Sequence, residues 1–226
     1  MALSGSVDFS LTAREAIKFA LRKAGILGIT QSLDDDLAAV TMEKLELMLK
    51  SWQLKGPHLW KKVEGSVSLT NATQSYTLST LNPLRILSIR YRNSSSVDLP
   101  MRRMSRERYF DLPVKSSAGT PSSFYFDPQR GSPTLYVWPV QATVTTETFQ
   151  ITYQKRIEDI DALDNDIDVE QEWLETVGYN LAVRIMHDYP VEGRSQDDIA
   201  AFAAQLKQEA MDFDREDTIS FDPSEY

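Results

Sequence analysis

The first regular pattern in the chain is a short amphipathic helix. Thr12 and Glu15 have the spacing of a capping box, and the pattern ends near Gly25, a residue type that often follows a helix. One face of the predicted helix consists of small or aliphatic residues, namely Ala13, Ala16, Ile17, Ala20, Leu21 and Ala24. Because most of these side chains are small, we expect another helix to pack closely against this face.

The second predicted helix is apolar on two faces. It runs from Ser32, past three aspartates that complement the positive end of the helix dipole, to the Gly56-Pro57 stop. At about 100° per residue, two nearly opposite stripes form: Ala38, Met42, Leu45, Leu49 and Trp52, and then Leu33, Leu37, Val40, Leu47 and Leu54. Such a helix should bury both faces. We favour a central helix sandwiched within its own subunit; the alternative is that Leu37, Val40 and Leu47 meet a neighbouring subunit.

The middle of the chain has the pattern of short strands. We predict strands at 63–70, 75–78, 85–92, 122–127, 134–138 and 149–154, with a short helix at 105–112. Apolar and polar residues alternate most clearly at Phe149, Ile151 and Tyr153. Interrupting prolines and the turn from Asp127 to Gly131 favour antiparallel strands in a meander or small sandwich over a parallel α/β sheet.

Two further helices are predicted after the strands. The first ends before Pro190 and repeats an apolar residue every four positions, at Trp173, Val177, Leu181 and Ile185. The second opens with Ser195 and Asp198 and carries an apolar face of Ile199, Phe202, Leu206, Ala210 and Phe213. We expect both helices to pack on the two N-terminal helices.

These patterns together predict an α+β fold, in which N- and C-terminal helices form a bundle and an antiparallel β-domain is inserted between them. The predicted parts are an N-terminal helical part at 1–62, a β-rich domain at 63–160, C-terminal helices at 161–213 and an extended acidic tail at 214–226. The tail has no periodicity, so we expect it to be extended or disordered when alone. Phe213, Phe221 and Tyr226 are candidates for anchoring it to a partner.

The composition excludes several kinds of site. The chain has 226 residues, of which 42% are hydrophobic, so it can bury a core without metal or disulfide staples. It contains no cysteine, which excludes disulfides, thiolate zinc sites, iron–sulfur clusters and cysteine nucleophiles. We see neither an export signal nor about 18 consecutive apolar residues, and expect a soluble protein without a membrane partner. A net charge of −9 argues against a tight grip on nucleic acid.

No recognisable catalytic motif occurs in the sequence. The two histidines, His58 and His187, are not spaced as helical metal ligands, and no Ser-His-Asp arrangement can be assembled. The glycines form no nucleotide-binding or nucleophile-elbow motif. We therefore predict no catalytic residues, no cofactor and no metal ion. A glycosidase needs only two carboxyl groups about 5–10 Å apart, so that enzyme class stays open in a chain with 33 acids.

An acidic segment precedes the third predicted helix. Residues 157–175 contain nine acidic residues and no basic one. The alternating aspartates at 164–168 have part of the spacing of a calcium-binding loop, but Val169 stands where a glycine would turn the chain. We favour a solvated acidic linker whose last acids complement the dipole of the following helix.

A basic stretch lies within the predicted β-domain. It contains Arg85, Arg90, Arg92, Arg102, Arg103, Arg106, Arg108 and Lys115. Opposite charges on separate parts of one subunit can steer head-to-tail association into a ring or a filament. The alternative is ordinary solvation of strand faces and loops. From this stretch we select four candidate interface residues: Arg102, Arg103, Arg106 and Arg108.

Several short runs occur in a recognisable order along the chain. They are 19–28, 45–60, 74–78, 83–87, 100–109, 119–121, 124–128, 135–139, 151–153, 172–174 and 179–181, and they include FALRKAGILG, QSYTL, PMRRMSRERY, FYFDP and LYVWP. Between about residues 12 and 190, this order resembles the tail accessory factors, or head-to-tail adaptors, of short-tailed phages. The chain departs from that family in its short tail after Phe213.

The resemblance implies a structural virion protein. Members of the family form a ring of twelve subunits that docks beneath the portal protein after DNA packaging. The ring extends the channel through which double-stranded DNA passes without specific binding, and it offers a platform to a tail nozzle or tail tubular protein. The implied location is the neck or tail of the virion, after assembly in the host cytoplasm.

Two other functions stay open at this point. One is a virion-associated glycosidase that degrades peptidoglycan with a carboxylate pair, which activity in a zymogram would favour. The other is a plug for the DNA end that uses the arginines from Arg85 to Arg108. Steeply salt-dependent DNA binding would favour the plug.

Overall fold

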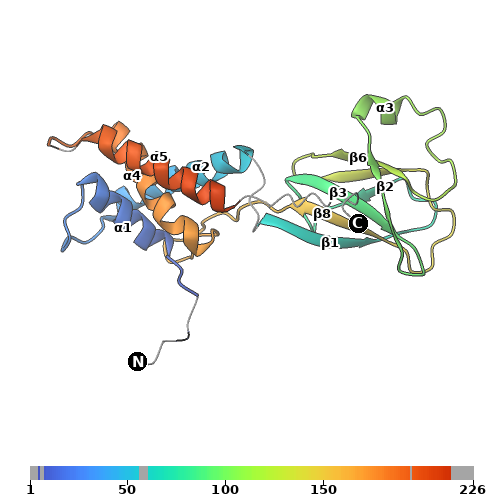
Figure 1. Cartoon of the computed structure of the whole chain (residues 1–226), viewed down its shortest axis with the longest axis horizontal. Helices are drawn as coiled ribbons and strands as arrows, with labels where there is room; N and C mark the ends of the chain where they lie inside the picture. The colour runs from blue at the N-terminus through green and yellow to red at the C-terminus, as the bar shows by residue number, and fades with distance from the viewer. Residues whose placement is uncertain (1–4, 6–7, 56–60, 194, 215–226) are drawn as a thin grey trace, which may run out of the picture. The chain divides into compact units, whose positions relative to one another are not determined.

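The chain folds into two compact units. The computed structural model describes residue 5 and residues 8–55, 61–193 and 195–214. One unit comprises Met1–Leu59 with Ile157–Tyr226, and the other comprises Trp60–Arg156. We call them the helical unit and the β unit, and Figure 1 labels many of the helices and strands of each. The α+β fold class, with a β-domain inserted between N- and C-terminal helices, is confirmed.

Helix α1 (Ala13–Ala24) forms as its sequence predicts. The Thr12 side chain caps the amide of Glu15 and the Glu15 carboxylate accepts from the amide of Thr12, which completes the capping box. Gly25 ends the helix in the left-handed conformation, with φ 80°. Its buried residues are the six of the predicted face: Ala13, Ala16, Ile17, Ala20, Leu21 and Ala24.

Helix α2 (Asp35–Trp52) begins later than predicted and continues into a 3-10 turn, η1 (Gln53–Lys55). The expected start at Ser32 is wrong because Asp34 is the cap. The Asp34 carboxylate accepts from the amides of Asp36 at 3.2 Å and Leu37 at 3.4 Å. Of the first predicted stripe, Ala38, Leu45, Leu49 and Trp52 are buried and Met42 is half-buried.

Helix α4 (Leu174–Asp188) is the centre of the helical unit. It follows a 3-10 turn, η3 (Gln171–Trp173), and packs against α1, α2 and α5. The four predicted residues Trp173, Val177, Leu181 and Ile185 are all buried. Because three helices surround α4, most of its circumference is apolar and buried.

Helix α5 (Gln196–Phe213) packs on α4, capped by Ser195 as predicted. The buried line on this helix is formed by Ala203 and Ala210, so the predicted face is wrong for Phe202 and Phe213, which are exposed. Small alanines let the backbones approach, and the Asn180 amide group donates to the carbonyl oxygen of Ala203 at 3.1 Å. Close approach therefore determined which face of α5 is buried.

The acidic segment before η3 is fastened to the N-terminal helices. The amide of Ala13 donates to the carbonyl of Asn165, and the amide of Ile160 donates to the Glu46 carboxylate, both at 2.8 Å. Three isoleucines of the segment are buried, at 157, 160 and 167. The interpretation as a solvated linker is wrong for these apolar positions, which pack while the acids between them remain at the surface.

The β unit contains two four-stranded sheets, ordered β1-β8-β3-β4 and β2-β7-β6-β5. The strands are β1 (Lys62–Ser68), β2 (Ser75–Thr77), β3 (Arg85–Arg92), β4 (Asp98–Pro100), β5 (Arg102–Arg103), β6 (Ser123–Asp127), β7 (Thr134–Trp138) and β8 (Thr148–Gln154). A short helix, α3 (Arg106–Phe110), is capped by Ser105. The six predicted strands and the short helix are therefore confirmed.

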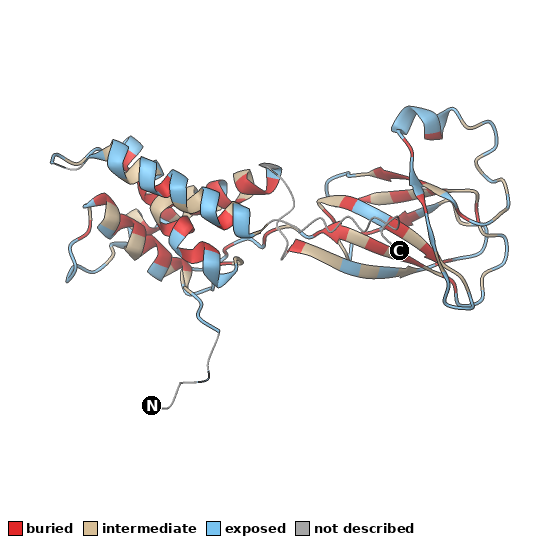
Figure 2. Ribbon diagram, in the orientation of Figure 1, coloured by how far each residue is buried: buried red, intermediate tan, exposed pale blue. Residues whose placement is uncertain are grey.

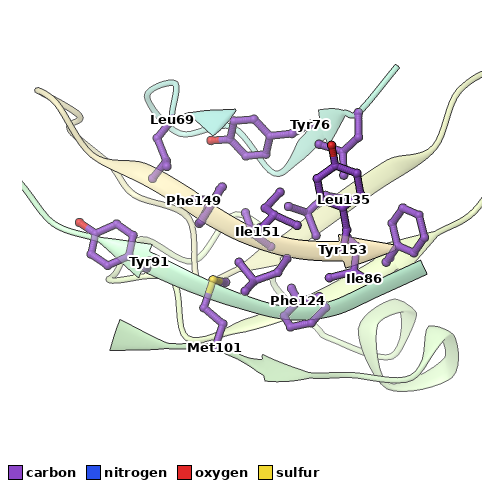
Figure 3. Packing of buried hydrophobic residues seen from close by; sticks show 14 residues of the cluster. Leu69, Tyr76, Ile86, Tyr91, Met101, Phe124, Leu135, Phe149, Ile151 and Tyr153 are labelled. Carbon is purple, nitrogen blue, oxygen red and sulfur yellow. The ribbon is translucent and has the colours of Figure 1, made fainter. Parts of the chain in front are cut away.

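Both sheets contribute side chains to one core, which makes the β unit a small sandwich. Figure 3 shows this core, where Phe149 and Ile151 of β8 lie between Tyr76 and Ile86 of other strands. The core cluster comprises Leu69, Tyr76, Leu78, Ile86, Ile89, Tyr91, Met101, Phe124, Phe126, Leu135, Val137, Phe149, Ile151 and Tyr153. The sandwich alternative is thus confirmed over a meander.

Two features of the sheets differ from the prediction. Strands β4 and β5 were not predicted, because they are two or three residues long and adjoin Pro100. Strand β5 also pairs with β6 in parallel, so the sheets are not wholly antiparallel. The β3–β4 hairpin is held by a bidentate pair in which the Arg92 guanidinium donates to both Asp98 carboxylate oxygens at 2.6 and 2.8 Å.

Candidate interaction surfaces

The second apolar stripe of α2 is exposed along most of its length. Val40 and Leu47 are 43% and 60% exposed, and Leu54 in η1 is 76% exposed. Helices α1 and α4 bury the first stripe and leave this one uncovered; the exposed side of each helix is pale in Figure 2. The interpretation that α2 is sandwiched within its own subunit is therefore wrong. Leu37, the remaining candidate on this stripe, is half-buried.

A groove of about 400 Å³ adjoins this stripe. Its lining residues are Lys44, Leu47, Val183, Arg184, His187, Asp188 and Gln196. Lys44 forms an ion pair with Asp188 across the groove, and this hydrogen bond lowers the pKa of the Asp188 carboxyl group. The Arg184 guanidinium donates to the Ser51 hydroxyl at 3.3 Å. The groove thus has an apolar floor and a rim with more positive than negative groups.

The sequence analysis did not identify this groove, because its residues belong to separate helices. The sequence did contain one indication of this surface. Lys44 and Ser51 continue the spacing of Leu37, Val40, Leu47 and Leu54, and together these positions alternate by three and four residues as in a coiled-coil seam. The polar members of that seam are the ones that contact α4.

Helix α5 carries a second uncovered apolar flank. Phe202 is 41% exposed and Phe213 is 73% exposed. The Phe202 ring packs edge-on against Tyr179 of α4, with ring centroids 4.8 Å apart. Phe213 is therefore available for the partner contact predicted for it, while Phe221 and Tyr226 lie outside the described residues.

The candidate arginines of the β unit are all exposed. Arg102 and Arg103 form the edge strand β5, and Arg106 and Arg108 lie on α3. The guanidinium of Arg106 lies over the ring of Phe110, 5.5 Å from its centroid. The other arginines of the basic stretch are not equivalent, since Arg90 pairs with Glu64, and Arg92 pairs with Asp98 as described above.

The acidic segment does not assemble a metal site within the described residues. Its carboxylates line a hollow of about 430 Å³, but several serve other contacts. Asp164 pairs with Arg14 at 2.9 Å, Asp159 pairs with Lys50, and Asp168 accepts from the amide of Glu158 at 2.8 Å. Asp164 thus attaches this segment to α1 and Asp159 attaches it to α2.

The displaced pKa values of two carboxyl groups in the β unit are caused by hydrogen bonds. Backbone amides of Thr145 and Thr146 donate to the Glu147 carboxylate and lower its pKa, as the Arg92 hydrogen bond does for Asp98. His187 is an exposed residue of the groove, and His58 lies outside the described residues.

Within the described residues, no helix is both long and apolar enough to cross a membrane.

Comparison with known proteins identifies the family. Residues 19–223 match the family model described as SU10 adaptor protein. No curated protein sequence matches the chain. Among solved structures, a chain of the neck of an empty GTA particle computed with C6 symmetry is 10% identical, with 83% of this chain and 86% of that chain covered. Its TM-score is 0.29, which is too low to support a conclusion. Because the family match covers most of the sequence, this chain belongs to the SU10 adaptor protein family.

Proposed function

We propose that the chain is one subunit of a head-to-tail adaptor ring in the neck of a phage virion. In this proposal twelve copies form the ring, after assembly in the host cytoplasm. The ring docks on the portal protein once DNA has been packaged, and it presents a platform to a tail nozzle or tail tubular protein. Membership of the adaptor family supports a structural role over an enzymatic one.

The observation that carries this proposal is the pair of uncovered flanks on the helical unit. Val40 and Leu47 on α2 and Phe202 and Phe213 on α5 are large apolar side chains in lines along helices. Such lines are a feature of surfaces that bind other proteins, whereas scattered apolar residues are ordinary. A subunit that repeats in a ring needs two such surfaces, one for each neighbour.

The net charge of −9 fits a channel component better than a DNA-binding protein. Double-stranded DNA carries dense negative charge, so an acidic channel disfavours sticking and lets the DNA move. The DNA in this proposal passes through the ring without specific recognition.

The proposal is tested by mixing the purified chain with the portal protein encoded beside it. We expect a complex whose mass corresponds to a portal ring with twelve added copies, and a second ring beneath the portal in electron micrographs. Mass measurement that shows only free portal and free chain, over a range of salt and protein concentrations, would reject the adaptor function.

A DNA-end plug is a second candidate because Arg102, Arg103, Arg106 and Arg108 are all exposed. A plug predicts DNA binding that weakens steeply with salt, since each neutralised phosphate releases counterions. The adaptor predicts no gel shift, or one that is insensitive to replacing the four arginines by glutamine. Loss of a strong low-salt gel shift in the glutamine variant would favour the plug.

A further inference from the structure

The two uncovered apolar flanks lie on different sides of the helical unit. We define the α2 flank as Leu37, Val40 and Leu47 with the groove beside them, and the α5 flank as Ile199, Phe202, Leu206 and Phe213. We infer that the α2 flank of one copy binds the α5 flank of the next copy, and that this contact closes the ring. The inference rests on the proposed adaptor ring and specifies which surfaces build it.

The position of α5 on α4 separates the flanks. On one side of α5, Phe202 contacts Tyr179, which in turn contacts Phe19 of α1 with ring centroids 5.6 Å apart. On the other side of α5, the Lys207 ammonium lies 4.1 Å from the ring centroid of Trp52, the last residue of α2. Phe202 therefore lies on the α1 side of α5, whereas the groove of the α2 flank is lined by α2, α4 and Gln196 at the start of α5.

This arrangement suits a head-to-tail contact. An isologous dimer places the same surface on both partners, whereas a ring of more than two copies needs two different surfaces that fit each other. Two separate flanks on one body allow each copy to contact two neighbours at once. The helical unit supplies both flanks, so the ring contact needs no contribution from the β unit.

The α2 flank is hollowed, and the α5 flank carries exposed aromatic side chains. The α2 flank contains the groove of about 400 Å³, whose floor includes Leu47 and Val183. The α5 flank offers Phe202 and Phe213, which are 41% and 73% exposed. Large aromatic side chains that insert into an apolar groove are the usual anchors of protein interfaces.

The charges of the flanks are also complementary. The groove is lined by two cations, Lys44 and Arg184, and by one carboxylate, Asp188, which is paired with Lys44, so Arg184 is the cation in excess. By helical spacing, the α5 flank is bordered by Asp198 and Glu209, both exposed. Placing the α5 flank on the groove would bring these carboxylates toward Arg184, which favours this pairing over α5 against α5.

Site-specific cross-linking tests the pairing, and the cysteine-free sequence makes each engineered thiol unique. One preparation carries Leu47→Cys and a second carries Phe202→Cys. They are mixed under the condition in which mass measurement shows rings, with the chain alone or with the portal protein present, and treated with a short bismaleimide. We expect at least five times more cross-linked dimer in the mixture than in either preparation alone.

Ile29→Cys is the matched control, because Ile29 is an 85% exposed apolar residue outside both flanks. Its mixtures with either variant should give no more dimer than random collision. Charge exchange provides a second measurement. Arg184→Glu and Glu209→Arg should each raise the concentration needed for half-assembly by about threefold or more, and the double variant should restore most of the loss.

The outcomes separate this inference from the proposed function. Rings that form without a Leu47–Phe202 cross-link would overturn the inference and leave the adaptor function standing. Strong cross-linking of the Leu47→Cys variant with itself would show an isologous contact and would also overturn it. Absence of rings both alone and with the portal would reject the adaptor function, and the inference with it.

Discussion

The β unit and the helical unit achieve stability in different ways. The β unit fills the space between two sheets with large side chains, and Phe149 at its centre contacts the rings of Tyr76 and Tyr91. The helical unit also buries large residues, but α1 and α4 approach through alanines and through Gly178. Large residues are moreover left uncovered in lines on α2 and α5.

The two units also differ in where they expose large apolar side chains. In the β unit the exposed large apolar residues lie mainly in the β3–β4 hairpin and in and after α3, at Val97, Leu99, Phe110 and Val114. In the helical unit Phe9, Ile29 and Tyr189 lie outside helices, and the others lie on helical elements, as at Val40 and Leu47. A closed core needs no partner, whereas a helix that leaves several large apolar side chains uncovered on one face is only partly satisfied in a single copy.

The largest expected effect comes from shortening a core side chain of the β unit. Phe149→Ala removes a fully buried ring and should lower the free energy of unfolding of that unit by about 3–5 kcal/mol. Hydrogen exchange followed by mass spectrometry should show lost protection at 62–154 and retained protection in α1, α2, α4 and α5. Equal loss in the helices would show that the two units do not fold separately, and so would remove the contrast.

Adding a side chain, instead of removing one, tests the close packing of the helical unit. An added Cβ at Gly178 would overlap the Phe19 ring, which packs against Tyr179. Gly178→Ala should therefore lower the free energy of unfolding by about 1–3 kcal/mol, despite the better helix propensity of alanine. Urea unfolding measures this change. The double variant with Phe19→Leu should recover part of the loss, and failure to recover it would contradict the overlap.

A smaller effect is expected at the start of α1. Thr12→Ala removes the cap and should cost about 1 kcal/mol of stability. Hydrogen bonds from the backbone and side chain of Thr12 lower the pKa of Glu15. The stabilisation from Glu15 is thus present above its ordinary pKa of 4.5 and is lost as the pH falls through the lowered value. The difference between variant and wild type should accordingly shrink in acid, and urea unfolding at several pH values would check it.

The smallest effect on the single copy is expected on the α2 flank. Leu47→Ser should change the free energy of unfolding by no more than about 0.5 kcal/mol, because the side chain is 60% exposed. Leu45→Ser, two residues away and fully buried, is the control and should cost about 2–5 kcal/mol. If urea unfolding gives similar losses for both variants, the α2 flank is covered within its own subunit.

Local patterns predicted much of the fold. The capping box and the alanines of α1 act within one turn or one face, so spacing alone identified every buried residue of that helix. The strands β3 and β7 occur at their predicted bounds because their sequences, RILSIRYR and TLYVW, combine strand-forming residues with flanking turns. The resemblance to head-to-tail adaptors also agreed with the family that matches residues 19–223.

Features that depend on distant contacts were not predictable in the same way. The buried face of α5 is set by how closely Ala203 approaches α4, and hydrophobicity alone favoured Phe202. The groove could not be predicted because residues that line it, such as Lys44 and Asp188, are 144 residues apart in sequence. For the four candidate arginines, sequence proposed their role and structure adds that they are exposed, so their part in an interface stays a prediction.

The chain leaves the helical unit for the β unit and later returns, and the outgoing and returning segments are hydrogen-bonded to each other within each unit. In the helical unit, the Gln53 side chain accepts a hydrogen bond from the amide of Ile157 at 3.2 Å. In the β unit, the amide of Lys155 donates to the carbonyl of Lys61 at 2.8 Å. The outgoing and returning segments are thus held side by side in the helical unit and in the β unit. Replacement of the β unit by a short loop is therefore expected to leave the ends of the helical unit where they are, because the two crossing segments are already adjacent.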